Sequence, residues 1–389
     1  MKFNEAQKTA LSHKTGPMMV LAGPGSGKTT VITHRIAGLL GAGVRPSEIL
    51  VITFTKASAR EMEERFYSLR PAVRENDTES GRVTFGTFHS VFYRILKLAY
   101  RFPAGCVLMI INYTYSMYHS HLKRKDAEFL ENSELEVEDE GEFISAVINE
   151  ISYVKGSQMD LSCYYSQNCP EEWFKRLYTG YEDMLRARGK LDFDDMLVMC
   201  YELFSQRKDI LSAWQRKFRY ILVDEFQDIN QIQYEIVKML ALPENNLFIV
   251  GDDDQSIYRF RGAKPEIMLG FEKDYPGARR VLLAENYRSS REIVETSLKL
   301  ISRNQVRFKK ELVPVHGSGR PVDVSVYENP LAEAEGTARR IRQYAQAGFA
   351  FEDMAVLFRT GNGTGLLAEK LMEYNIPFSM RDVIPSLYG

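Results

Sequence analysis

A glycine-rich segment near the N-terminus combines the residue types that bind phosphate. It reads Ala22-Gly23-Pro24-Gly25-Ser26-Gly27-Lys28-Thr29, follows the apolar run 18–22 and leads into a helical pattern over 29–40. Glycines let successive backbone N–H groups curve around phosphate oxygens, and the N-terminus of the following helix adds positive charge. Lys28 can reach the β- and γ-phosphates, and the Thr29 hydroxyl can bind Mg²⁺. This spacing, with Ala22 where a glycine is common, predicts a nucleoside triphosphate site; the alternative is a glycine-rich turn without a ligand.

Two acids lie where such a site needs them. Asp224 and Glu225 directly follow the apolar run 220–223, about two hundred residues after the glycine-rich segment. At the end of a strand beside the phosphate loop, Asp224 can hold the Mg²⁺ shell, and Glu225 can orient or deprotonate the attacking water. An apolar strand that ends in two acids is common by itself, but with the phosphate loop it indicates triphosphate hydrolysis.

A third polar run also follows an apolar one. It reads Gly251-Asp252-Asp253-Asp254-Gln255. Three interpretations stay open: an acidic turn, a metal site built from three carboxylates, or a contact from Gln255 to the γ-phosphate that senses its loss.

The elements that position these residues alternate between strand and helix patterns. Apolar runs at 18–22, 49–54, 83–85, 220–223 and 247–250 predict strands, and helical patterns follow the first three. This alternation predicts an α/β fold with a parallel sheet covered by helices on both faces.

The alternation stops between about residues 91 and 190, where we expect an inserted, mainly helical subdomain. That region includes an acidic stretch from 131 to 142, interpreted as a solvated face. After a break at 275–277, the run 281–284 is predicted to start a second sheet, which continues through 322–326 and 355–358.

Composition excludes several classes of protein. Hydrophobic residues make up 44% and charged residues 26% of the 389 residues, with a net charge of −2, which excludes a disordered or polybasic chain. No apolar run is long enough to span a membrane; the nearest, 102–122, is expected to be a buried strand or loop. Without an N-terminal apolar signal, a cytoplasmic protein is expected. The cysteines lack Cys-x-x-Cys spacing and are expected to be reduced thiols rather than a metal site: Cys106, Cys163, Cys169 and Cys200.

Seven blocks in the same order resemble the UvrD/Rep/PcrA family of superfamily 1 DNA helicases. They cover residues 4 to 290: the phosphate loop and 4–7, 53–57, 86–90, 223–228, 251–258 and 285–289. The resemblance implies a P-loop NTPase that uses ATP and Mg²⁺. A first RecA-like domain would span 1–90 and 191–277, the insertion 91–190, and an incomplete second RecA-like domain 278–389.

The resemblance also implies roles at the nucleotide. Gln7 would recognise the adenine edge, Tyr287 would stack on the base, and Arg288 would reach the γ-phosphate. Gln255 and Arg288 would report the nucleotide state to the DNA-binding surface. Thr30 would border the nucleotide, where the family often has an arginine.

For DNA, the resemblance implies that Phe54, Tyr258 and Phe260 stack on bases of a single strand. Phe260 stands where the family commonly has tryptophan, which would reduce the stacking area. Phe54 and Phe260 could instead be core aromatics, and a histidine such as His89 is more often a buried core residue. The remaining residues would contact the strand backbone or couple the two sites: Thr53, Thr55, His89 and Arg261.

The implied function is ATP-dependent DNA unwinding with 3′ to 5′ movement on single-stranded DNA or 3′-tailed duplex DNA, in repair or recombination. Two later motifs of the family are absent before Gly389. We therefore expect the N-terminal portion of a helicase, with little hydrolysis and no unwinding by itself. The alternatives are the motor part of a helicase–nuclease, or a non-catalytic P-loop module that binds ATP and DNA.

Overall fold

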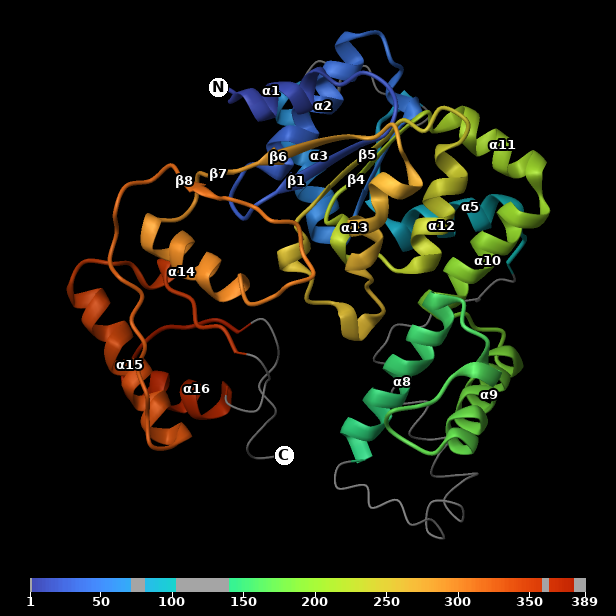
Figure 1. Ribbon diagram of the computed structural model, residues 1–389. Helices are drawn as coiled ribbons and strands as arrows, with labels where there is room; N and C mark the ends of the chain where they lie inside the picture. The colour runs from blue at the N-terminus through green and yellow to red at the C-terminus, as the bar shows by residue number, and fades with distance from the viewer. Residues whose placement is uncertain (1, 71–80, 103–139, 359–363, 381–389) are drawn as a thin grey trace. The chain divides into compact units, whose positions relative to one another are not determined.

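The computed structural model describes residues 2–70, 81–102, 140–358 and 364–380. The chain divides into two compact units, residues 1–320 and 321–389. All the predicted site residues belong to the first unit, which is built around the central sheet of Figure 1.

Six parallel strands form that sheet in the order β3-β2-β4-β5-β1-β6. In β1, Met18 lies opposite Phe248 of β5 and Arg279 of β6. The inner strands are apolar on both sides because helices cover both faces. The strands are β1 (Met18–Ala22), β2 (Ile49–Thr53), β3 (Thr84–Thr87), β4 (Tyr220–Val223), β5 (Leu247–Gly251) and β6 (Arg279–Leu283).

The two faces of the sheet have separate cores, and successive residues of β1 alternate between them. Met18 and Val20 pack with α1, α2 and α3, whereas Met19 and Leu21 pack with α5 and α10 to α13. The predicted α/β architecture is confirmed by this arrangement. These helices are α1 (Glu5–Ser12), α2 (Lys28–Gly41), α3 (Lys56–Leu69), α5 (Phe88–Ala99), α10 (Phe193–Gln206), α11 (Lys208–Lys217), α12 (Gln231–Ala241) and α13 (Pro265–Asp274).

Two further helices, α8 (Glu140–Ser157) and α9 (Glu171–Ala187), have a core of their own. Ile144, Val147 and Ile151 recur at helical spacing along α8 and pack with Phe174 and Tyr181 of α9. Both helices lie in the predicted insertion. Cys106, the stretch 103–122 and the acidic residues 131–139 lie outside the described residues.

The prediction that residues 281–284 start a second sheet is wrong. Residues 279–283 form β6, which pairs with β1 at the edge of the first sheet. Two short segments, β7 (Glu285–Asn286) and β8 (Val313–Pro314), then form a separate parallel pair. An apolar run predicts a strand but not the sheet that the strand joins.

Residues 322–326 and 355–358 are not strands in the structure, which corrects the second part of that prediction. Val324, Val326 and Leu357 are 88%, 92% and 93% exposed. An isolated extended segment gains little stability in water without a neighbouring strand to pair with it. The first unit also contains α14 (Arg291–Ile301). In the second unit, α15 (Pro330–Gln346) and α16 (Thr364–Glu373) pack through alanine and leucine side chains.

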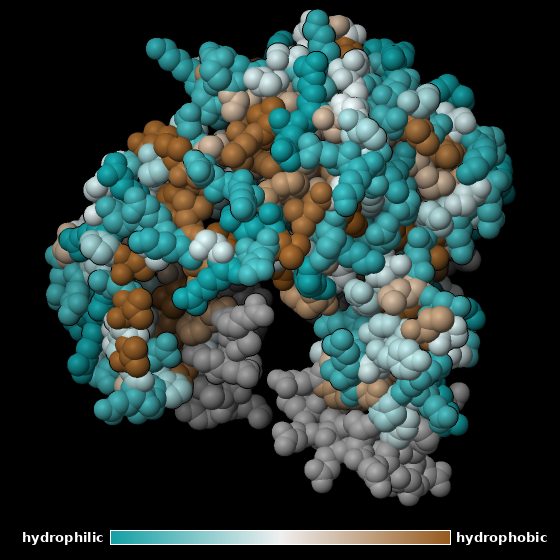
Figure 2. Space-filling model, in the orientation of Figure 1, coloured by the Kyte–Doolittle hydropathy of each residue, from teal (hydrophilic) through white to brown (hydrophobic). Residues whose placement is uncertain are grey.

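The surface in Figure 2 is mainly hydrophilic with separate apolar areas, one of them around β7 and β8. Val313 and Val315 in that segment are about half exposed. Across the described ranges, no helix combines the length and apolar character needed to cross a membrane. Cys163, Cys169 and Cys200 are free thiols, as expected, but only Cys200 is buried.

Candidate functional site

The glycine-rich segment forms a tight loop between β1 and α2. Gly25 and Gly27 have φ angles of 65° and 88°, which glycine adopts without strain. The Ser26 hydroxyl donates to the Gly23 carbonyl at 2.7 Å and closes the turn. Within the described part of the chain, no side chain caps the N-terminus of α2, so no side chain competes with an anion for its first N–H groups.

Residues 285–288 pack directly on this loop. The Asn286 amide donates to the Pro24 carbonyl at 2.7 Å, and the Tyr287 N–H donates to the Gly25 carbonyl at 3.0 Å. A Cβ atom on Gly25 would lie 2.6 Å from the Cβ of Arg288. The loop therefore needs glycine at position 25 both for its backbone conformation and for this close approach.

A cavity of about 540 Å³ lies beside the loop, within the usual size range of small-ligand pockets. Residues 24–30 form one wall, and five other predicted residues also line the cavity: Asp224, Glu225, Gln255, Tyr287 and Arg288. The structure thus brings together most of the predicted nucleotide-binding residues.

One wall of the cavity was not predicted from the sequence. Ser58, Glu61, Met62 and Arg65 of α3 line it. Their spacing of i, i+3, i+4 and i+7 puts them on one face of the helix. That spacing indicates a shared helix face, but it does not indicate a binding site, because an ordinary amphipathic helix has the same spacing.

Three predicted residues lie beside the cavity rather than on its wall. Ala22 is the last, fully buried residue of β1, and a Cβ on Gly23 would lie 2.4 Å from Leu312. Gln7 is buried, and its amide donates to the Ser26 carbonyl at 3.3 Å. Asn4 caps α1 and donates to the Tyr287 hydroxyl at 3.1 Å, a link that the sequence did not reveal.

The acids after β4 are held in different ways. The Lys28 ammonium lies 2.8 Å from Oε2 of Glu225, and the Gln227 amide donates to the same oxygen at 2.9 Å. Glu225 has φ 50° and ψ 44°, an uncommon conformation for a residue other than glycine. Such strained residues cluster at functional sites, where the surrounding structure holds them in place.

Asp224 has the properties of a ligand for a divalent cation. It is buried, and its Oδ1 atom has no hydrogen-bond partner among the residues that the structure describes. Burial, and then the neighbouring charge of Glu225, raise the pKa of Asp224 to about 7. A cation at this carboxylate would give Oδ1 a partner and would offset the repulsion between Asp224 and Glu225. Thr29, the other proposed metal ligand, lines the same cavity. The residues present therefore fit Mg²⁺.

The carboxylates of residues 252–254 do not surround an open metal position. The Lys310 ammonium contacts all three, at 2.5 Å for Asp252 and 3.0 Å for Asp254. Arg307 donates to both oxygens of Asp254 at 2.6 and 2.5 Å. Two side-chain cations thus take the place that a metal ion would need.

Three of the predicted DNA-binding aromatics lie together. The rings of Phe54 and Tyr258 are 4.8 Å apart, and those of Tyr258 and Phe260 are 6.1 Å apart. The Arg261 guanidinium lies 5.5 Å from the rings of both Tyr258 and Phe260. Phe260 is 57% exposed, so it is not a core aromatic.

The other predicted DNA-binding residues have local structural partners. The buried Thr53 donates to the Thr55 carbonyl at 3.0 Å, and the Thr55 side chain caps α3. The His89 ring packs edge-on against Phe193, with centroids 5.1 Å apart. Burial lowers the pKa of His89 to about 4, although Asp192 opposes this shift. The ring is therefore neutral at pH 7 and offers no positive charge to a phosphate.

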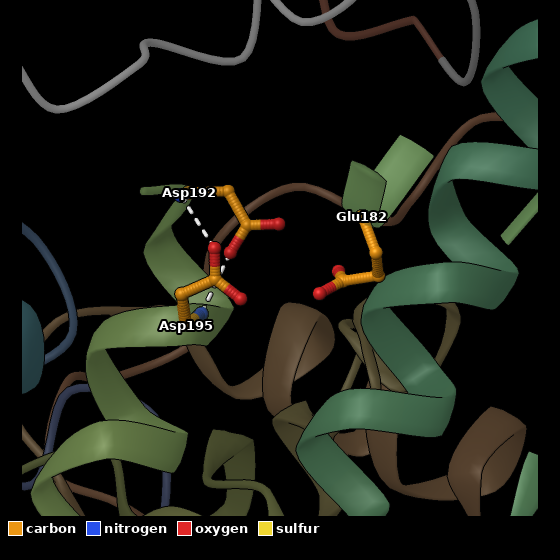
Figure 3. A group of neighbouring side chains, drawn as sticks. All are labelled: Glu182, Asp192 and Asp195. Carbon is orange, nitrogen blue, oxygen red and sulfur yellow. Dashed lines mark hydrogen bonds between the residues drawn. The ribbon is translucent and has the colours of Figure 1, made fainter. Parts of the chain in front are cut away.

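A separate group of carboxylates joins the helical insertion to the sheet domain. Glu182, Asp192 and Asp195 face one another in Figure 3. The buried Lys155 ammonium lies 2.5, 2.8 and 2.7 Å from them, respectively. Because a lysine already supplies the positive charge, this group is a buried ion-pair network linking α8, α9 and α10.

The family models that match this chain describe helicase domains, in agreement with a nucleotide site. Residues 3–276 match the family model described as the UvrD/REP helicase N-terminal domain. The chain belongs to this helicase family. Residues 281–385 match the UvrD-like helicase C-terminal domain.

Similar proteins carry helicase names. A Bacillus subtilis (strain 168) protein named "Putative ATP-dependent DNA helicase YjcD" is 37% identical over 412 residues, which cover 100% of this chain and 50% of that protein. The ATP-dependent DNA helicase PcrA of Staphylococcus aureus (strain NCTC 8325 / PS 47) is 36% identical over 383 residues, 97% of this chain and 50% of that protein. The chain spans about half the length of the curated relatives it matches.

Proposed function

We propose that this chain carries the ATP-binding and single-strand-binding core of an ATP-dependent DNA helicase. The observation that carries the proposal is one cavity lined by the phosphate loop, Asp224, Glu225, Gln255 and Arg288. Lys28 of the loop supplies a cation for phosphate, and Arg288 supplies a second one. Asp224 supplies a metal ligand, and Glu225 can orient a water molecule. The helicase names of the similar proteins support the same function.

In this proposal Lys28 and the N-terminal N–H groups of α2 hold the β- and γ-phosphates. Thr29 and Asp224 would hold Mg²⁺, which would neutralise negative charge on the phosphates. Glu225 orients the attacking water, and Arg288 stabilises charge that develops at the γ-phosphate. The ion pair between Lys28 and Glu225 would have to open when phosphate arrives, which would release the carboxylate for water.

The DNA part of the proposal rests on the aromatic cluster of Phe54, Tyr258 and Phe260. Stacking suits a motor that moves along any sequence, because every base has an aromatic face. Gln255 lines the nucleotide cavity only three residues before Tyr258. A movement of Gln255 when the γ-phosphate is lost can therefore shift Tyr258 and the DNA strand stacked on it. We extend the proposal to 3′ to 5′ movement on single-stranded or 3′-tailed duplex DNA and to a role in repair or recombination. A second RecA-like domain, expected from residue 278, would have to begin after β6, because residues 279–283 belong to the first sheet.

Lys28→Ala tests the phosphate site. Loss of a charged contact to phosphate should weaken binding of a fluorescent ATP analogue with Mg²⁺ by about 10-fold or more. Lys299→Ala, on an exposed lysine of α14, is the matched control and should bind like the unmodified chain. Equal affinity of the chain and the Lys28→Ala variant for the analogue would refute the proposed site.

A further inference from the structure

A buried charge cluster contacts Gln255, a residue that lines the nucleotide cavity. Its members are the side chains of Asp252, Asp253, Asp254, Arg307 and Lys310. The Asp252, Asp253 and Lys310 side chains are 0%, 2% and 1% exposed. Three carboxylates and two cations leave a formal charge of −1 in a site that is largely shielded from solvent. Buried charges of this kind are stable only when each is paired and hydrogen-bonded.

Lys310 is the shared partner in this cluster. Its ammonium contacts Asp252, Asp253 and Asp254, whereas Arg307 forms its ion pair with Asp254. Burial works to lower the pKa of Lys310, but the attraction of Asp252 and Asp253 outweighs it and raises that pKa. Lys310 therefore remains charged at neutral pH.

Asp252 connects Lys310 to the cavity. One of its oxygens, Oδ1, lies 2.5 Å from the Lys310 ammonium, and the other, Oδ2, accepts a hydrogen bond from the Gln255 amide at 2.7 Å. The Asp252 N–H donates to Gln227 at 2.9 Å, and Gln227 donates to Glu225 at 2.9 Å. A continuous series of contacts thus runs from Lys310 to both Gln255 and Glu225.

We propose that Lys310 is a positioning residue for ATP hydrolysis: it fixes the Asp252 carboxylate, which orients the Gln255 amide at the cavity wall. This inference rests on the proposed function, in which Gln255 contacts the terminal phosphate. Without the ammonium, Asp252 and Asp253 repel each other in a buried site. Asp252 then turns away or is displaced, and Gln255 loses its fixed acceptor.

The kinetic test is a double-mutant cycle of Lys310→Met and Gln255→Ala. Lys310→Met should lower kcat for hydrolysis in the presence of single-stranded DNA by about 10- to 100-fold, the usual effect of misplacing a reacting group. KM for ATP should stay within about 3-fold, because Lys310 does not line the cavity. In the Gln255→Ala background the same substitution should have little further effect. A purely structural role would give the same loss in both backgrounds, and that result would overturn the proposal.

Two variants control for folding and charge. Lys309→Met makes the same change at the exposed neighbouring lysine and should leave hydrolysis unchanged. Lys310→Met with Asp253→Asn removes one positive and one negative charge, so the net charge of the cluster is kept. If Lys310→Met fails to fold, this charge-balanced variant takes its place in the cycle and should show the same dependence on Gln255.

A second measurement does not depend on hydrolysis. In the nucleotide-free chain labelled with ¹⁵N-glutamine, NMR follows the Gln255 side-chain amide, identified by its loss in Gln255→Ala. Its exchange with water should become at least about 10-fold faster in the charge-balanced variant and stay unchanged in Lys309→Met. Unchanged exchange would overturn the role of Lys310 even if the chain hydrolyses ATP. Faster exchange in a chain that cannot hydrolyse ATP would instead count against the proposed function alone.

Discussion

Single side chains bring together parts of the sequence that are far apart. Lys28 and Glu225 are 197 residues apart, yet their charged atoms lie 2.8 Å from each other. Each was predictable from its own motif, because a phosphate loop and a strand end carry local signals. Lys310 was not predictable, since it lies 58 residues after Asp252 in a segment with no motif of its own.

Phe54→Ala should weaken binding of single-stranded DNA by about 1–3 kcal/mol, the usual contribution of one stacked base. The chain should still fold, because Phe54 is partly exposed at the edge of the aromatic cluster. Fluorescence anisotropy with a labelled oligonucleotide measures the effect. Tyr165→Ala, at a 72% exposed tyrosine outside that cluster, is the control and should bind normally. Loss of folding in Phe54→Ala would show instead that Phe54 is a core residue.

His89 should make stability depend on pH. The unfolded chain binds a proton at this ring near pH 6.5, whereas the folded chain does so only near pH 4. Folding stability should therefore fall as pH falls from about 6.5 to about 4, by up to about 3 kcal/mol. His89→Phe keeps a ring against Phe193 but removes the titration.

Urea unfolding at about pH 7 and pH 4.5 measures this contribution. The loss of unfolding free energy between the two pH values should be smaller in His89→Phe than in the unmodified chain. Equal losses in both proteins would show that His89 is not the titrating group.

Helices and strands were predictable from the local sequence pattern where an element is buried in a regular way. The runs 18–22, 49–53 and 220–223 were predictable strands because helices bury both of their sides. The apolar run 281–284 was predictable as a strand, and it overlaps β6 (Arg279–Leu283), but the sheet of this strand was not predictable, because pairing with β1 depends on the path of the whole chain. Helix α3 has a double role that pattern could not show: its N-terminus follows Phe54, and one face lines the nucleotide cavity.

Lys155→Met should loosen the helical insertion. The variant leaves the carboxylates of Glu182, Asp192 and Asp195 without their shared cation, and breaking a buried ion pair typically costs about 3–5 kcal/mol. Urea unfolding should detect this loss. Lys175→Met removes a partly exposed lysine that pairs with Glu171 within α9, and it should cost only about 0.5 kcal/mol. Similar small costs for both variants would contradict a stabilising role for the Lys155 network.

Across the whole molecule, the nucleotide cavity and the aromatic cluster belong to one compact unit, residues 1–320. Gln255 and Tyr258 link them within a single short segment after β5. The order of the seven sequence blocks made the family predictable. Two contacts became visible only in the folded chain: one connects two of the blocks, from Asn286 to Pro24, and the other connects Asp252 to Lys310, which lies outside the blocks.

Hydrolysis of Mg·ATP, with and without a single-stranded oligonucleotide, tests the link between the two sites. We expect DNA to raise a low basal rate, and Glu225→Gln to lower the stimulated rate by about 100-fold or more while ATP still binds. Bound ATP and bound DNA without stimulated hydrolysis, or full activity in Glu225→Gln, would contradict the proposed motor. The first of these results would favour a module that binds both ligands without catalysis.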